Sequence, residues 1–441
     1  MEEIKYDQMK DSGIEWIGNI PKEWDLIPLK QVASFKTGGT PPLSEGVNFE
    51  KGLPWFKPSD FSADISLLSN SENFINFESV KRNRINVFPR NTLLMITIAS
   101  IGRVGLLEQD SYSNQQITAL TIKDQNKLLP KYLLYVSGTL AKYLKESTMS
   151  SVVPIVNINF LSSCKVPMPN INEQINIVDY LENELKKIEN IIDKAKRSLK
   201  LLNKIRKSII FETVTKGLDN NVEMKDSGVE WIGEIPVDWE YSKICYTTRL
   251  NGRIGWQGLT SDEYTDEGPY LITGTDFTEG KVNLETAVHI SYKRWQEAKE
   301  IQVKNGDLLI TKDGTVGKVA MIDGLDSEAS LNSGVLRIRT YNQVDTRYLY
   351  WILNSEVFWN WFNYTNGGNS TILHLYQNVF EKFSFPLPNI AVQKKISDFL
   401  DENISTLDES IKKVEESISL AEQIKKSLIY EYTTGKKRVR L

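Results

Sequence analysis

The chain has 441 residues, 40% of them hydrophobic, and a formal net charge of -4 at pH 7. This length predicts roughly two to four domains, and the charge excludes bulk positive charge as a source of nucleic-acid affinity. The sequence has no apolar run of roughly 18 residues that would predict a membrane helix. Its two cysteines, Cys164 and Cys245, form neither a disulfide framework nor a metal-ligand spacing. We therefore expect a cytoplasmic protein.

A segment near the amino terminus occurs twice. The segment MKDSGIEWIGNIPKEW at 9–24 returns as MKDSGVEWIGEIPVDW at 224–239, with 12 of 16 positions identical. A second matching pair begins at Pro167 and Pro386, where PMPNINEQINIVDYL corresponds to PLPNIAVQKKISDFL. The chain is therefore a tandem duplication. An identical segment cannot discriminate between different targets, so we expect its tryptophans to pack inside the fold: Trp16, Trp24, Trp231 and Trp239.

The segments between these repeats differ between the two copies. Residues 25–165 carry 15 basic and 11 acidic side chains, whereas residues 240–385 carry 14 and 18. Any DNA binding would therefore depend on local patches or on partner subunits. Each variable segment is expected to form a mixed α/β domain. Apolar stretches and amphipathic patterns predict strands and helices, the strands near 92–99, 117–122, 307–312 and 318–322 and the helices near 130–145 and 346–362.

A long helical pattern follows each Pro-x-Pro. Its apolar residues alternate spacings of three and four, which is the heptad pattern of a coiled coil, and each helix is expected to run roughly 40 residues. A surface helix packed on its own domain is the weaker alternative. The first seam comprises Val178, Leu181, Leu185, Ile188, Ile192, Ala195, Leu199 and Leu202. The second comprises Leu400, Ile404, Leu407, Ile411, Val414, Ile418, Ala421, Ile424 and Leu428.

The order of the segments predicts how the two helices pair. The second variable domain starts just after the first helix and finishes where the second begins, so these two helix ends must lie close together. A domain of about 150 residues has a radius of gyration of only about 15 Å, which favours an antiparallel pair. We therefore predict an α/β (mixed α+β) chain with pseudo-two-fold symmetry, its two variable domains separated by an antiparallel coiled coil. The predicted segments are domain one at 1–166, a helical region at 167–222, domain two at 223–385 and a helical region at 386–441.

The sequence lacks the usual motifs of catalytic, phosphate-binding and metal-binding sites. His289 and His374 are the only histidines, and both belong to copy two, which excludes a histidine mechanism shared by the copies. The sequence has neither a phosphate-binding G-x-x-x-x-G-K-[ST] loop nor the [DN]-P-P-[YF] motif of adenine-methylating enzymes. The triplet Glu184-Leu185-Lys186 has no partner acid with which to hold a metal ion. We therefore expect a non-catalytic chain with no metal site.

Two divergent domains, each preceded by SG[IV]EWIG-x-IP and followed by a Pro-x-Pro-x-x-x-x-Gln helix, resemble the specificity subunits of Type I restriction-modification systems. The resemblance covers nearly the whole chain. It implies that the variable domains are target-recognition domains, each reading one half of a bipartite DNA sequence, and that the helical regions bind modification subunits. One departure is visible, because Glu173-Gln174 at the start of the first helix becomes Val392-Gln393 in the second.

The candidate DNA contacts lie in or beside Gly-rich loops, since such loops let backbone amides approach phosphates, and Arg103 occupies the position that matches Lys318. Residues 36–41 (KTGGTP) resemble one version of the family's recognition domain and residues 252–259 (GRIGWQGL) another, which implies two unlike half-sites. Sequence reading needs groups at base edges and phosphates, with no reactive group. The candidates are Lys36, Thr37, Gly38, Gly39, Arg103, Gly252, Arg253, Gly255, Trp256, Lys312 and Lys318. The basic end from Lys436 to Arg440 is expected to be a frayed tail.

Partners supply the chemistry that the resemblance implies. Two modification subunits would methylate adenine from S-adenosylmethionine, and restriction subunits would add ATP-driven translocation and cleavage with Mg. The expected target is gapped and asymmetric double-stranded DNA. Two alternatives remain open: a coiled-coil scaffold whose heads bind proteins, and the recognition part of a truncated fused restriction enzyme.

Overall fold

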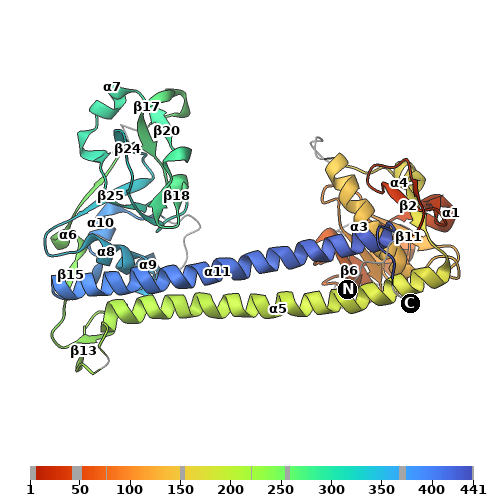
Figure 1. The fold of residues 1–441 in the computed structure, drawn as a ribbon, viewed down its shortest axis with the longest axis horizontal. Coiled ribbons are helices and arrows are strands. Elements are labelled where there is room, and N and C mark those ends of the chain that lie inside the picture. The colour runs from red at the N-terminus through yellow and green to blue at the C-terminus, as the bar shows by residue number, and fades with distance from the viewer. Residues whose placement is uncertain are drawn as a thin grey trace. The chain divides into compact units, whose positions relative to one another are not determined.

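The computed structural model describes residues 6–41, 52–75, 77–148, 154–219, 221–253, 259–366 and 374–439. The chain forms two compact units, unit 1 with Met1–Ala195 and Glu416–Leu441, and unit 2 with Lys196–Glu415. Each unit holds one variable domain and part of both long helices, α5 (Ile171–Lys216) and α11 (Ile390–Thr433). Figure 1 labels several elements of each unit.

The central sheet of unit 1 has five strands in the order β4-β11-β8-β9-β6. Its pairs are antiparallel except for β9 with β6. Helix α3 (Pro130–Ser147) packs on this sheet through apolar residues such as Leu133 and Leu140. A second sheet has the order β10-β5-β7. The strands are β4 (Ala33–Thr37), β5 (Leu53–Phe56), β6 (Ile65–Leu68), β7 (Phe74–Ile75), β8 (Leu93–Ile96), β9 (Val104–Leu107), β10 (Tyr112–Ser113) and β11 (Ile117–Ile122).

The central sheet of unit 2 repeats this frame, which extends the duplication into the variable domains. Its order is β16-β25-β22-β23-β19-β18, and β23 with β19 is again the parallel pair. A second sheet has the order β20-β17-β24-β21. The strands are β16 (Thr248–Gly252), β17 (Tyr264–Ile272), β18 (Phe277–Thr278), β19 (Lys281–Val282), β20 (Val288–Ile290), β21 (Gln302–Val303), β22 (Leu308–Thr311), β23 (Val319–Met321), β24 (Ala329–Leu331) and β25 (Val335–Thr340).

The four strands predicted from the sequence are present as β8, β11, β22 and β23, and the first predicted helix is α3. The helix predicted at 346–362 is wrong in one respect, because it is two helices, α8 (Thr346–Leu353) and α9 (Glu356–Asn366). The break has a local cause: the Ser355 hydroxyl accepts a hydrogen bond from the Val357 amide at 3.2 Å and so caps α9. In unit 2, α8 and α9 lie between the sheet and α11 (Figure 1).

Both long helices begin with the same arrangement of polar side chains. Asn170 and Asn389 cap them, each accepting an amide hydrogen bond at 3.0 Å from the residue three positions on. Gln174 is fully buried, accepts from the Leu129 amide and donates to the carbonyls of residues 127 and 169. Gln393 makes the equivalent three bonds in unit 2. These satisfied amides attach each helix to the loop before α3 or α8.

The long helices run antiparallel within unit 1. Tyr180 packs against Tyr432 with ring centroids 4.6 Å apart, and further along, Glu189 pairs with Lys425. In unit 2, the side chain of Arg206 forms a double hydrogen bond with Asp408, at 2.6 and 3.1 Å. These contacts within each unit confirm the predicted antiparallel pairing of α5 with α11.

The predicted seam is buried or half-buried at all of its residues except one. The prediction is wrong for Ile424, which is 47% exposed. Ile424 lies six residues after Ile418, with Ala421 midway between them, whereas a coiled-coil seam returns to the same helix face after seven residues. The missing residue turns Ile424 about 100° away from the seam. Lys425, one residue on, lies in phase and is half-buried beside Glu189.

The leading repeats form the same short hairpin in both units, β1 (Met9–Asp11) with β2 (Asn19–Pro21) and β13 (Met224–Asp226) with β14 (Glu234–Pro236). Their tryptophans pack inside the units as predicted: Trp24 and Trp239 are buried, and Trp16 and Trp231 are half-buried. The remaining pairs are β3 (Asp25–Pro28) with β12 (Lys165–Met168) and β15 (Glu240–Lys243) with β26 (Ser384–Leu387). The short helices are α1 (Leu29–Val32), α2 (Phe77–Asn83), α4 (Ile158–Ser163), α6 (Ile244–Thr247), α7 (Tyr292–Gln296) and α10 (Gln377–Phe380).

Candidate nucleic-acid interface

The candidate loops of unit 1 meet at one edge of its central sheet. Strand β4 ends at Thr37, opposite Thr118, and β8 ends at Ile96, opposite Ile117 at the start of β11. The segments that continue from these ends therefore share one edge, which we call loop edge 1: residues 38–41, 97–103 and 113–116. The sheet register brings Lys36, Thr37, Gly38, Gly39 and Arg103 to this side of the domain.

Gly38 and Gly39 serve packing in this structure and do not offer free amides. The Gly38 amide donates to the Ile117 carbonyl at 3.1 Å, and the Gly39 amide donates to the Ser113 carbonyl at 2.8 Å. A Cβ atom on Gly38 would lie 2.2 Å from the Ser113 carbonyl oxygen. The expectation that these amides approach phosphate is therefore corrected, because the chain already uses them. Lys36 is exposed and Thr37 half-buried beside them.

The hairpin at 97–103 presents Arg103 to solvent. The Ala99 amide donates to the Pro154 carbonyl at 2.9 Å, and Ile98 forms a bridge with Ile155. Arg103 is exposed, and its Nη1 donates to the Phe61 carbonyl at 3.3 Å. This single bond holds the guanidinium at the loop edge and leaves other donors available to a ligand.

Unit 2 has the equivalent edge. Gly252 at the end of β16 lies opposite Leu336, and Thr311 at the end of β22 lies opposite Val335. Loop edge 2 comprises residues 253, 312–318 and 332–334. Within it, Lys318 is exposed and Lys312 half-buried, while the tip residue Asp313 pairs with His374. The candidates Gly255 and Trp256 lie outside the described residues.

Arg253 is a correction to the predicted DNA contacts. Its side chain is only 3% exposed, and it donates to the Leu331 carbonyl at 2.8 Å and to the Ser330 hydroxyl at 3.1 Å. Burial lowers the pKa of Arg253 below its ordinary value. Gly252 likewise serves packing, since a Cβ there would lie 2.6 Å from the Leu336 side chain. A guanidinium bound to an interior carbonyl and an interior hydroxyl stabilises the sheet and does not reach a base.

A second buried arginine was not singled out by the sequence. Arg337 on β25 is 2% exposed, and its guanidinium donates to the Asn251 side chain at 2.8 Å and to the Gln302 carbonyl. Burial, and then the charge of Arg339, lower the pKa of Arg337 to about 10. Arg339 itself pairs with the buried carboxylate of Asp307 at 2.7 Å. Basic residues of this domain therefore support its framework.

The described residues contain no group of three or more His, Cys, Asp or Glu side chains that could hold a metal ion. The His289 ring contacts the Gly268 carbonyl at 2.7 Å. Glu184 pairs on the helix surface with Lys187 at 2.6 Å. None of the helices in the described part of the chain is both long and apolar enough to cross a membrane.

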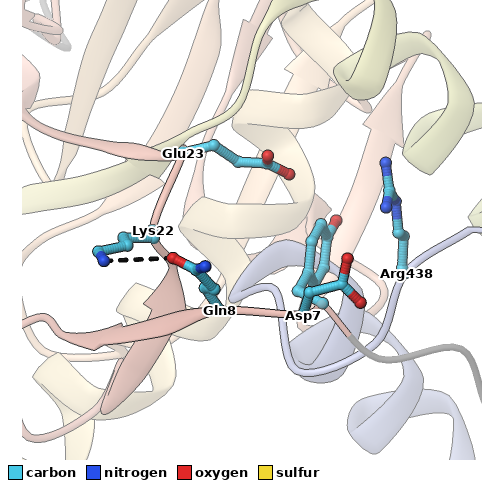
Figure 2. A pocket seen from close by; sticks show the side chains of 6 residues that line it. Asp7, Gln8, Lys22, Glu23 and Arg438 are labelled. Atoms are coloured by element: carbon cyan, nitrogen blue, oxygen red, sulfur yellow. Dashed lines mark hydrogen bonds between the residues drawn. The ribbon is translucent and has the colours of Figure 1, made fainter.

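The two ends of the chain meet in unit 1 around a polar pocket of about 420 Å³ (Figure 2). Glu173 accepts hydrogen bonds from Tyr6 at 2.6 Å and from the buried Trp24 indole at 2.9 Å. Arg438 lies over the Tyr6 ring, 5.4 Å from its centroid. Lys436 donates to the Ile17 carbonyl at 2.7 Å, and burial lowers its pKa. The expectation of a frayed tail is therefore wrong for the described residues 436–439, of which Lys436 contacts the leading repeat and Arg438 contacts Tyr6.

Comparison with known proteins identifies the family to which this duplicated chain belongs. Two segments, 21–201 and 253–420, match the family described as Type I restriction modification DNA specificity domain. The chain belongs to this family. As a member, it is a DNA specificity subunit of a Type I restriction-modification system.

Relatives of full length support this membership. The specificity subunit of Type I restriction enzyme MjaVIII from Methanocaldococcus jannaschii is 23% identical over 428 residues, which cover 96% of this chain and 94% of the relative. The putative MjaX specificity subunit of the same organism is 26% identical over 439 residues and 96% of both chains. A solved structure from work on complex assembly and conformational transition of the type I R-M system has a TM-score of 0.70 at 14% identity, covers 94% of this chain and 98% of its own, and shows that the specificity subunit shares its fold.

Proposed function

We propose that this specificity subunit reads a bipartite, asymmetric double-stranded DNA target, one half with each variable domain, and has no catalytic activity of its own. The proposal rests on one observation: the two variable domains share the same central sheet arrangement, but their loop edges carry different side chains. Loop edge 1 presents Arg103, with Lys36 beside it on β4, whereas loop edge 2 presents Lys312 and Lys318 beside the Asp313–His374 pair. The shared frame places the two loop edges equivalently, and their unlike side chains then contact two different half-sites.

The reactions belong to partner proteins in this proposal. Two modification subunits bind the helical regions and transfer methyl groups from S-adenosylmethionine to adenine, and restriction subunits use ATP and Mg to translocate and cleave DNA. Methylation of a base requires its extrusion from the duplex, which a subunit of this kind directs by fixing the register on DNA. The proposed location is the cytoplasm, where these partners and DNA are present.

Methylation-sensitive sequencing of DNA from cells that express the chain with its modification subunit tests the proposal. The intact chain should produce a gapped adenine motif with two unlike halves. The variant Lys312→Gln/Lys318→Gln should change or weaken marking in the half read by unit 2 alone. Lys281→Gln, an exposed lysine of the same domain that pairs with Asp323 at 3.4 Å, is the matched control and should leave the motif intact.

A methylation pattern that does not depend on the chain would contradict the proposal and favour the scaffold alternative. A chain that prefers one DNA sequence but directs no methylation by a separate modification subunit would favour the alternative of a truncated fused enzyme instead. A chain that marks or cuts DNA without any partner would contradict the proposed lack of catalytic activity.

A further inference from the structure

A pocket of about 470 Å³ lies beside the hairpin of loop edge 1. It is lined by Ala99, Ser100, Ile101, Arg103, Lys145, Thr148 and Pro154. Its two charged groups come from different elements, Arg103 from the hairpin and Lys145 from the last turn of α3. The predicted helix at 130–145 contained Lys145, but nothing in the sequence linked it to the hairpin.

The backbone of the hairpin is shaped to bring these two cations together. Gly102 has a φ of +108°, and a Cβ on it would lie 2.9 Å from the Lys145 Cδ atom. A side chain at this position would be strained at this φ and would displace the lysine stem from the hairpin. Ala99 also has a positive φ of 65°, a conformation that costs a non-glycine residue on the order of 1 kcal/mol. Strain of this kind occurs often at ligand sites.

The pocket has the charge that a phosphate requires. Among the described residues, none of those that line it is acidic, and neither Arg103 nor Lys145 forms an ion pair with a described carboxylate. The Arg103 bond to the Phe61 carbonyl fixes one arm of the guanidinium, and the remaining donors suit a phosphate oxygen. Two uncompensated cations in one concave site repel each other and gain most from an anion between them.

Unit 2 is built differently at the equivalent place. Gly317 corresponds to Gly102, but a Cβ on it would lie 2.6 Å from the Trp359 ring. Lys318 takes the position of Arg103, and the half-buried Trp359 takes the position of Lys145 against the glycine. The paired cations are therefore a feature of unit 1 within the described part of the chain.

We propose that Arg103 and Lys145 together bind one backbone phosphate of the DNA half-site that unit 1 reads, and so fix the register of that domain on the duplex. This inference rests on the proposed function. Because a phosphate carries no sequence information, the pair sets affinity and salt dependence without choosing the bases.

Binding of the chain in complex with its modification subunits to a fluorescent duplex that carries the methylated motif tests the inference. Arg103→Gln and Lys145→Gln, singly and together, should lower affinity, and the double variant should lower it about tenfold at 0.1 M salt. The slope of log K against log salt should become shallower by about one in the double variant. Lys142→Gln is the matched control, because Lys142 lies on the same helix and pairs with Glu146 at 4.0 Å outside the pocket lining.

The methylated motif separates the outcomes. An unchanged motif with weaker, less salt-dependent binding supports the phosphate site. A motif that relaxes at one position would show a base contact and overturn the inference, as would binding equal to that of Lys142→Gln. If the unaltered complex shows no sequence preference at all, the proposed function itself fails. Equal thermal midpoints for all variants exclude misfolding as the cause.

Discussion

Replacing Glu173 by valine should loosen both chain ends in unit 1. Copy two has Val392 at the equivalent position, where it packs as an apolar side chain. In copy one, the carboxylate accepts hydrogen bonds from Tyr6 and from Trp24. Valine offers no acceptor, so both donors lose their partner.

The magnitude follows from the burial of the two donors. Trp24 is fully buried, and leaving its indole N–H unsatisfied costs about 1–3 kcal/mol. Tyr6 is also buried, at 8% exposure, but it lines the polar pocket, so the loss of its hydrogen bond costs ~1 kcal/mol. The sum is about 3 kcal/mol, and for a unit of this size it lowers the thermal midpoint by roughly 6–12 °C.

Calorimetry gives the thermal midpoint, and hydrogen exchange shows where the loss occurs, since local opening is seen in the amides concerned. The amides of β1 and β2 should exchange faster in Glu173→Val, while those of β13 and β14 should not change. Glu184→Val is the matched control, because Glu184 forms only a surface pair with Lys187 and its loss costs at most about 1 kcal/mol. Equal midpoints for the two variants would refute this account of the junction.

Two further predictions concern unit 1. Gly38→Ala should destabilise it by about 1–3 kcal/mol, because the new methyl meets backbone that cannot move aside; Gly39→Ala, which meets only a side chain at 3.3 Å, should shift the urea midpoint much less, and equal shifts would contradict the reasoning. Burial raises the pKa of Tyr132 well above its ordinary value. The unfolded chain releases that proton near pH 10 while the folded chain keeps it, so the free energy of unfolding should fall as pH rises above about 10. Tyr132→Phe should make that fall shallower in urea titrations, and an unchanged slope would show that the hydroxyl does not contribute.

The helix ends were readable from the sequence because their causes are local. An asparagine cap precedes each long helix, and Gly217 and Gly435 follow their ends with φ values of +80° and +70°, the usual way to stop a helix. The coiled-coil seam could be predicted for the same reason. Its last part was wrong at Ile424, where two successive spacings of three residues turn the side chain out of the seam.

The DNA-contact candidates could be predicted only in part from the sequence. The sequence located the loops that the sheet register brings to one edge, and the exposed Lys36, Arg103 and Lys318 remain candidates. It could not distinguish Arg253 from these, because a basic residue in a Gly-rich segment has the same pattern whether its guanidinium faces water or interior carbonyls. That choice depends on Ser330 and Leu331, which lie about 80 residues away along the chain.

The sequence by itself determined the duplication, the two long helices, their antiparallel direction and the family, since each follows from repeats, periodicity or chain order. Tertiary structure alone decided which polar groups are hydrogen-bonded inside the protein and which can still bind a ligand. It closed the amides of Gly38 and Gly39, buried Arg253 and brought Lys145 to Arg103. The physical reason is that hydrogen-bond satisfaction and charge pairing depend on neighbours in space, which packing selects from distant parts of the chain.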